Sequence, residues 1–227
     1  SKLIGEFRAV VFSPAHLSLV KEGPVQRRRF LDLALSQLRP RYASLLSQYN
    51  RALAQRNILL KDIAYHSELM DTLAIWDERL AMLGAQIIYQ RRSYVDRMQE
   101  SAVAFYHGLS RGREELSLAY ASSIEGRSAE EIAYELSEKL TKNRAEDLKN
   151  GSTSVGPHRD DLEIYVDQLS ARIYGSQGQQ RSCALSMKLS EAALIREITG
   201  EQPVALLDDV MSELGAGRQD YILNHIE

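Results

Sequence analysis

The sequence predicts an α/β head that is interrupted by a large α-helical lobe. Three observations support this fold class: a short apolar run near the start, two long amphipathic patterns across residues 24–108, and alternating strand and helix patterns after residue 116. The chain has 227 residues, of which 44% are hydrophobic and 26% charged. This length and composition are enough to bury a core in one or two domains.

The first half of the chain predicts one strand followed by long helices. Phe7–Phe12 is a branched apolar run stopped by Ser13 and Pro14, which indicates a buried strand. A helical pattern begins at Pro24 and is divided or kinked by Pro40, and a second one runs over residues 67–108. Two long amphipathic helices in series predict an antiparallel helical lobe.

The second half predicts strands and helices in alternation. Strands are expected at Leu116–Ser122, at Leu162–Val166 with a return strand at Ala171–Tyr174, and at Val204–Leu207. The last of these has no polar interruption, as expected for a strand covered on both faces. Helices are expected from Ser128, with Glu131 completing a capping box and Gly151 as the stop, and over residues 178–199, closed by Gly200.

Composition excludes several classes of protein. No apolar run approaches the roughly 20 residues that span a bilayer, and the first residues lack the order of a signal peptide, so we expect a cytoplasmic location. The single cysteine, Cys183, cannot form an intramolecular disulfide and is expected to be a buried small hydrophobe. No Cys/His spacing indicates a zinc site.

Positive charge is concentrated in one segment although the formal net charge is -3. Residues 21–61 hold nine Lys and Arg against two acids. Such a segment could neutralise DNA phosphates, although charge on a helix is more often a solvated face. The arginines considered for DNA are Arg27, Arg28, Arg29, Arg39, Arg41, Arg51 and Arg56.

The stretch Val204–Leu214 (VALLDDVMSEL) has the pattern of a Walker B motif, a hydrophobic strand that ends in two carboxylates. Ligands gather at the carboxyl ends of parallel strands, so Asp208 is predicted to hold Mg²⁺ and Asp209 to orient or deprotonate the attacking water. The alternative is an acid pair that caps the following helix, and this motif alone does not decide between them.

The stretch Tyr174–Arg181 (YGSQGQQR) lies at a predicted strand-to-helix junction. A serine hydroxyl at 176, a glycine at 178 and a helix N-terminus together suit a phosphate. An ordinary serine N-cap is the alternative. The order of the two motifs favours the first interpretation, because an S-x-G-Q helix followed by a strand with an acid pair is the order found in ATP-binding-cassette ATPases.

Five separated blocks carry a more specific resemblance. VVFSPAHLSLVKEGPVQRRRFLD, YNRALAQRNILLK, TSVGPHRDDLEI, GSQGQQRSCALSMKLSEAALI and LLDDVMSEL resemble the RecF family of bacterial recombination mediators over most of the chain. This resemblance implies an ATP-binding-cassette head related to the structural-maintenance-of-chromosomes ATPases, with a helical lobe in place of a coiled coil. It further implies ATP and Mg²⁺ as cofactors and an ATP-dependent homodimer.

The resemblance also assigns roles to residues and partners. It implies that Ser176, Gln177, Gly178 and Gln179 form the signature that touches the γ-phosphate held by the opposite subunit, that Asp208 and Asp209 are the Walker B pair, and that Ser212, Glu213 and Leu214 begin the D-loop. Family members usually continue with Asp where this chain has Gly215. The implied partners are double-stranded DNA and its junctions with single strands, RecO and RecR, and indirectly RecA, in repair, replication and the SOS response.

A phosphate loop is not found in these 227 residues. It requires G-x-x-x-x-G-K-[ST], and no Gly-Lys pair occurs; Gly151–Gly156 has the glycine spacing but continues with Pro157 and His158. We therefore expect an N-terminally truncated member that does not hydrolyse ATP alone, the complete protein being a weak DNA-dependent ATPase. The expected organisation is a partial head segment at 1–22, a lobe at 23–150 and a second head segment at 151–227.

Three alternatives stay open at this point. The chain could be a non-catalytic helical module that binds DNA or a partner, or the head of a transporter ATPase, although the GPHRDD and RRRFLD blocks do not belong to transporters. The GPHRDD block itself could suggest a metal or catalytic site at His158, Asp160 and Asp161. A turn whose acids cap or enter a strand is favoured there.

Overall fold

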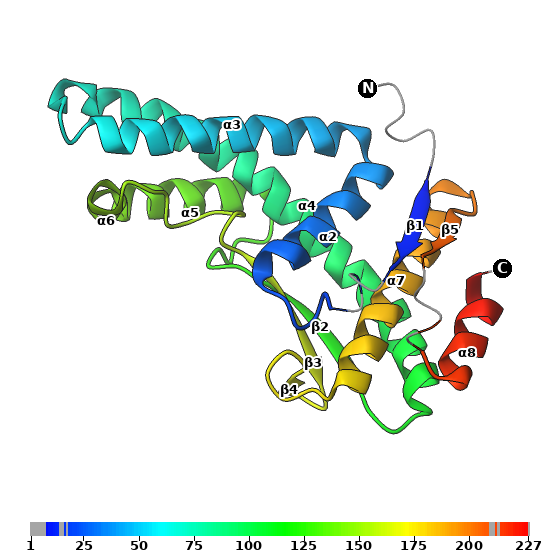
Figure 1. Cartoon of the computed structure of the whole chain (residues 1–227). Coiled ribbons are helices and arrows are strands. Elements are labelled where there is room, and N and C mark those ends of the chain that lie inside the picture. Colours follow the sequence, from blue (N-terminus) through cyan, green and yellow to red (C-terminus); the bar gives the residue numbers. More distant parts are fainter. Residues whose placement is uncertain (1–7, 14–15, 17, 209–211, 213, 227) are drawn as a thin grey trace. The chain divides into compact units, whose positions relative to one another are not determined.

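The computed structural model of the chain describes residues 8–13, 16, 18–208, 212 and 214–226 (Figure 1). The chain divides into two compact units, which we call the first unit (residues 1–40, 93–120 and 161–227) and the second unit (residues 41–92 and 121–160). The elements are, in order, β1 (Ala9–Phe12), α2 (Pro24–Leu38), α3 (Pro40–Asp62), the 3₁₀ helix η1 (Ser67–Leu69), α4 (Met70–Ser110), β2 (Leu116–Ala121), α5 (Ala129–Lys142), α6 (Arg144–Asn150), β3 (Asp161–Val166), β4 (Leu169–Ser170), α7 (Gln177–Thr199), β5 (Val204–Leu207) and α8 (Ala216–Ile226).

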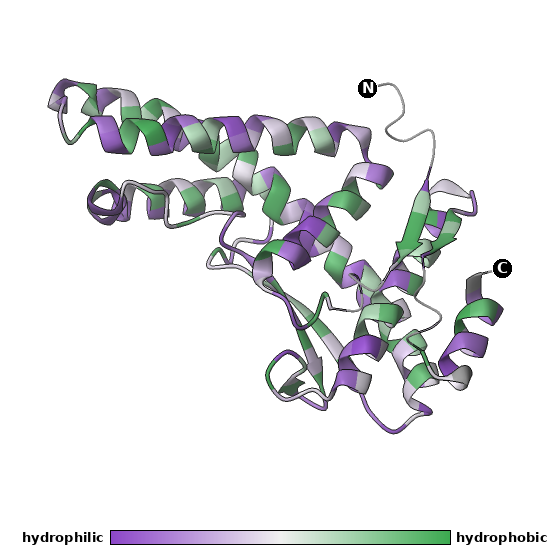
Figure 2. Ribbon diagram, viewed as in Figure 1, coloured by the Kyte–Doolittle hydropathy of each residue, from purple (hydrophilic) through white to green (hydrophobic). Residues whose placement is uncertain are grey.

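The first unit contains a parallel pair of strands, β1 and β5, with Ala9 opposite Val204 and Phe12 opposite Leu207. Both strands are hydrophobic, as Figure 2 shows, and the core beneath them includes Val10 and Phe12 with side chains of α7 and α8. The expectation that β5 is covered on both faces is wrong for the described residues. Val204 and Leu206 are 44% and 46% exposed, and β5 pairs only with β1 within the described part of the chain.

A second sheet of the first unit has the strand order β2-β3-β4. Its hairpin was expected to return at Ala171–Tyr174, and this prediction is wrong. Asp167 and Gln168 both have positive φ, 48° and 65°, and they reverse the chain immediately into Leu169–Ser170. Residues 171–174 then form a turn in which Tyr174 N–H donates to the Ser170 carbonyl. This second turn ends the return strand at Ser170.

Helix α7 of the first unit begins and ends where the sequence predicts. Ser176 is its N-cap, and Gly200 closes it in the left-handed conformation at φ 73°. Cys183 is buried within this helix, and burial raises the pKa of its thiol to about 12. The expectation of a buried small hydrophobe is therefore confirmed.

The second unit is helical, with Leu60 and Leu73 in one of its cores and Trp76 packed against it. Gly84 lets helix α5 approach α4 closely, since a Cβ there would lie 2.8 Å from Cδ2 of Leu136. The Ser128 capping box is confirmed, whereas the expected single helix to Gly151 is divided at Asn143 into α5 and α6.

Within the described ranges, no helix combines the length and apolar character of a membrane span. The boundaries at 22 and 150, which separate the expected head and lobe, stay a prediction.

Candidate functional site

The junction at residues 176–179 is the N-terminus of helix α7. The Ser176 hydroxyl accepts a bond from the Gln179 N–H at 3.2 Å, and the Gln179 side-chain oxygen accepts one from the Ser176 N–H at 2.7 Å. These reciprocal bonds form a capping box. The N-cap interpretation is thus geometrically correct, and it leaves the remaining first-turn N–H groups without intrahelical acceptors. An anion can bind at such a helix end.

A pocket of about 450 Å³ opens at this helix end within the first unit. Among the described residues of its wall, three arginines and one glutamate carry formal charges, which gives these residues a net charge of +2. The positive end of the α7 dipole adds to this potential. The lining residues of the pocket are Gly108, Leu109, Ser110, Arg111, Arg113, Glu114, Ser176, Gly178, Gln179, Ser182, Gly215, Gly217 and Arg218.

The segment that follows the Walker B pattern reaches this same pocket. Arg218, in the first turn of α8, donates to the Gly178 carbonyl at 3.3 Å and to the Ser182 hydroxyl at 3.2 Å. Among the expected D-loop residues, Ser212 is exposed and Leu214 is buried in the core. Glu213 lies outside the described residues. The chain after Asp208 therefore contacts the turn at 176–179 through Arg218.

Asp208 follows β5 at the carboxyl end of the parallel pair. Its N–H donates to the Phe12 carbonyl at 2.8 Å, and its side chain is exposed. Beyond the end of β1, the Ser13 hydroxyl bonds to Nδ1 of His16 at 2.9 Å. A carboxylate at this edge suits Mg²⁺. Asp209, the second acid, lies outside the described residues.

Glu114 connects the pocket wall to the turn at residues 176–179, which we call the signature turn after the resemblance described above. Its Oε1 accepts a bond from the Gln179 amide nitrogen at 2.9 Å, and its Oε2 accepts one from the Tyr106 hydroxyl at 2.7 Å. Burial, followed by this bond to Glu114, raises the pKa of Tyr106, so the phenol stays a donor. Sequence reasoning missed Glu114, Arg111, Arg113 and Arg218. The charged run at 111–115 was a local signal for the first three, and Arg218 lies outside that run.

Two of the seven arginines considered for DNA are buried in ion pairs. Arg27 is 3% exposed; its Nη2 lies 2.7 Å from Oδ2 of Asp161, and its Nη1 donates to the backbone carbonyls of Val20 and Glu22. Arg56 is fully buried. Neither guanidinium is accessible to a phosphate, so the structure argues against these two predicted contacts.

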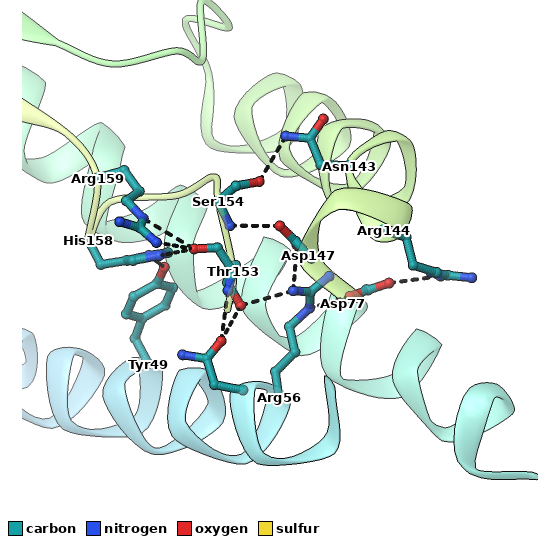
Figure 3. Close-up of polar contacts among 11 residues, drawn as sticks. Tyr49, Arg56, Asp77, Asn143, Arg144, Asp147, Thr153, Ser154, His158 and Arg159 are labelled. Carbon is teal, nitrogen blue, oxygen red and sulfur yellow. Dashed lines mark hydrogen bonds and ion pairs between the residues drawn. The ribbon is translucent and has the colours of Figure 1, made fainter. Parts of the chain in front are cut away.

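Arg56 is the centre of a polar network in the second unit (Figure 3). Its Nε donates to Asp77 at 2.7 Å, and its Nη1 donates to Asp147 at 2.7 Å and to the Thr153 hydroxyl at 2.9 Å. The second oxygen of Asp77 accepts from Arg144 at 2.8 Å. A guanidinium suits this role because its fixed fork of donors reaches several acceptors at once.

The GPHRDD block closes this network as a turn (Figure 3). The Thr153 carbonyl accepts from Arg159 and from Nε2 of His158, at 3.0 Å for the histidine. Because a carbonyl only accepts, Nε2 carries the proton and Nδ1 accepts from the Tyr49 hydroxyl at 2.7 Å. Burial raises the pKa of Tyr49, which keeps this donor protonated. The contacts of His158 are those of a structural residue.

The other five arginines are at least partly accessible. Arg28 is half-buried, and Arg29, Arg39, Arg41 and Arg51 are exposed. Arg41 and Arg51 lie about 15 Å apart along α3 at the helical rise of 1.5 Å per residue. The polar residues Ser44, Gln48 and Gln55 are exposed on the same helix. This exposed stripe of α3 is one part of the second unit that suits a polyanion.

Comparisons with known sequences and with solved structures point to the same relatives, whereas the comparison with family models does not. No model of a known protein family matches the chain. The chain is 48% identical to the DNA replication and repair protein RecF of Agathobacter rectalis over 226 residues, which cover all of this chain and 60% of that protein. It is 44% identical to RecF of Lachnoclostridium phytofermentans, covering 100% and 61%, and 47% identical to RecF of Heliobacterium modesticaldum, covering 96% and 59%.

Solved structures give the same result. The recombination mediator protein RecF-ATPrS in the RecFOR pathway matches with a TM-score of 0.93 at 42% identity, over 100% of this chain and 61% of that one. RecF-ATP in the same pathway matches with a TM-score of 0.92 at 43% identity and the same coverage. The chain thus spans about three fifths of the length of the relatives it matches.

Proposed function

We propose that this chain is part of a RecF-family protein, an ATP-binding-cassette-type ATPase that acts in DNA repair, replication and recombination. The observation that carries the proposal is the pocket at the N-terminus of α7, where the signature turn and the segment after Asp208 meet. The two solved relatives that match over the whole chain are described as RecF-ATP and RecF-ATPrS. ATP is therefore the ligand for which the site is proposed.

The signature turn contributes donors to a phosphate in this proposal. Ser176, Gln177, Gly178 and Gln179 would contact the γ-phosphate of an ATP that a second copy holds. The net positive charge of the pocket and the dipole of α7 support an anion at this place. A signature that acts on the opposite subunit's nucleotide would couple ATP binding to dimerisation.

The carboxyl edge of the β1–β5 pair would hold the metal and the attacking water. Asp208 would bind Mg²⁺, Asp209 would orient or deprotonate the water, and Ser212, Glu213 and Leu214 would begin the D-loop. When bound, Mg²⁺ neutralises charge on the phosphate oxygens. Gly215 stands where the family usually has Asp, which removes one charged contact of this loop across the dimer.

The phosphate loop is not among these 227 residues, since they contain no Gly-Lys pair. We therefore expect no ATP hydrolysis from this stretch alone. Hydrolysis is expected from a RecF-length protein that contains this chain. Release of phosphate by the 227 residues alone, abolished by Asp208→Asn, would contradict this part of the proposal.

Dimerisation tests the signature. A RecF-length protein that contains this chain should dimerise in ATP and Mg²⁺, as measured by sedimentation velocity, and Ser176→Arg should prevent dimerisation because the long cation fills the phosphate position. Ser67→Arg places the same side chain on an exposed serine of the second unit and serves as the control. Equal dimerisation of the two variants would refute the signature assignment.

Double-stranded DNA and its junctions with single strands are the proposed nucleic-acid substrates. Arg28, Arg29, Arg39, Arg41 and Arg51 are the candidate contacts, because Arg27 and Arg56 are buried. Each lost phosphate contact should lower the slope of log affinity against log salt by about 0.9. Arg41→Gln with Arg51→Gln should reduce the slope by about two, and an unchanged slope would remove α3 from the interface.

Protein partners follow from the pathway in which the solved relatives are placed. We propose RecO and RecR as partners and an indirect role in loading RecA. A second candidate function, a non-catalytic module that binds DNA or a partner protein, is favoured by the exposed stripe of α3. DNA or RecR binding by this chain without nucleotide, together with nucleotide-independent behaviour of the RecF-length protein, would favour it.

A further inference from the structure

Among the described residues that line the pocket at the N-terminus of α7, the one acid is Glu114, and it lies beside the turn that is proposed to bind a phosphate. A carboxylate opposes an anionic ligand, so Glu114 lowers the positive potential that its arginine neighbours provide. Its two bonds, one to Gln179 and one to Tyr106, identify a different contribution. We infer that Glu114 is a positioning residue that fixes the signature turn through the amide of Gln179.

The amide of Gln179 can satisfy its neighbours in only one orientation. Its oxygen must face the Ser176 N–H, which only donates, and this turns its nitrogen toward Glu114, which only accepts when ionised. The Ser176 N–H and the Glu114 carboxylate therefore determine together which end of the amide faces the N-cap. With this orientation fixed, the Ser176 hydroxyl and the first-turn N–H groups keep one geometry before a ligand arrives.

Glu114 is itself held by the fold from three directions. The hydroxyl of the fully buried Tyr106 donates to it. The backbone of the next residue, Glu115, is hydrogen-bonded to the β3–β4 hairpin. Its N–H donates to the Asp167 carboxylate and its carbonyl accepts from the Asp167 N–H, both at 2.9 Å. On the other side, the left-handed Gly112 closes α4 by donating to the His107 carbonyl. The carboxylate is thus preorganised.

The inference rests on the proposed function of the signature, and it adds a residue that lies 65 positions away in the sequence. The test uses a RecF-length protein that contains this chain and measures the ATP concentration needed for half-maximal dimerisation. Glu114→Ala and Glu114→Asp should each raise this concentration about tenfold, since a hydrogen bond to a charged group is lost. Glu114→Gln should stay within about threefold, because its amide oxygen can still accept from Gln179.

Glu115→Ala is the matched control. It removes the same charge from the adjacent exposed residue, whose bonds to Asp167 of the β3–β4 hairpin are made by its backbone. A purely structural role of Glu114 would lower the thermal midpoint without separating Gln from Asp at this position. Equal half-maximal concentrations for Glu114→Asp and Glu115→Ala would overturn the inference, whether or not Glu114→Ala folds.

The Ser176→Arg variant separates failure of this inference from failure of the proposed function. If Ser176→Arg dimerises normally, the signature assignment is wrong and the positioning role has no site to act on. If Ser176→Arg stays monomeric while Glu114→Asp responds to ATP like the wild-type protein, only the positioning role is wrong.

Discussion

Replacement of Arg56 by Met should destabilise the second unit, because it removes the centre of the buried polar network. Methionine fills a similar volume but leaves Asp147, which is fully buried, with the Ser154 N–H as its remaining bond. Asp77 keeps its bond to Arg144. Removing one partner of a buried ion pair costs about 3–5 kcal/mol. Against a typical total stability of about 5–15 kcal/mol, this is a large fraction.

Urea unfolding followed by tryptophan fluorescence measures this change where it occurs. Trp76 is the single tryptophan of the chain and packs against a core of the second unit, so its signal reports on that unit. With a urea m-value of about 2 kcal/mol/M, the midpoint should fall by about 1.5–2.5 M. The urea midpoint of Arg56→Lys should lie between those of the wild type and Arg56→Met, because an ammonium keeps the charge but cannot reproduce the forked contacts.

Arg51→Met is the control for this experiment. Arg51 is exposed on the same helix, five residues before Arg56, and its replacement should change stability by no more than about 0.5 kcal/mol. If the midpoint of Arg56→Met falls no further than that of Arg51→Met, the network in Figure 3 does not stabilise the second unit and the reasoning is refuted.

Two further outcomes are expected in the first unit. Burial, with Lys188 and Arg29 nearby, lowers the pKa of His16. The unfolded chain therefore binds more protons than the folded chain below about pH 6.5, and stability is lost as the pH falls through that range. His16→Asn should flatten the pH dependence of urea midpoints between pH 7.5 and 5.5, and an unchanged slope would contradict this. Gly200→Ala should lower the free energy of unfolding by about 1 kcal/mol, because the φ of 73° strains an alanine although no atom lies within 4 Å of the new Cβ. Calorimetry that shows no loss of stability, or a smaller loss for Gly200→Ala than for Gly200→Asn, would argue against this.

The sequence predicted most helix and strand positions because these depend on neighbours a few residues apart. Pro24, Pro40 and Gly200 delimit helices through their own backbone constraints, and the capping box at Ser128 is a pattern of four residues. The same local reasoning placed a helix N-terminus at Ser176 and an acid at the carboxyl end of β5. That these positions bind nucleotide and metal stays a prediction.

Local patterns did not predict how far a strand continues or which strand face is covered. The return strand was predicted at 171–174, whereas the positive φ of Asp167 and Gln168 reverses the chain earlier and places it at Leu169–Ser170. The exposure of β5 depends on which elements pack against its faces, and a run of apolar residues carries no information about those elements.

What the sequence by itself determined is therefore the order of the elements and the family resemblance, because both are properties of contiguous residues. The tertiary structure alone decided which charges are available. Arg56 meets Asp147 across 91 positions, Arg27 meets Asp161 across 134, and Gln179 meets Glu114 across 65. An arginine on a helix has the same local pattern whether its partner is water, a phosphate or a distant carboxylate, and only folding brings that partner within bonding distance.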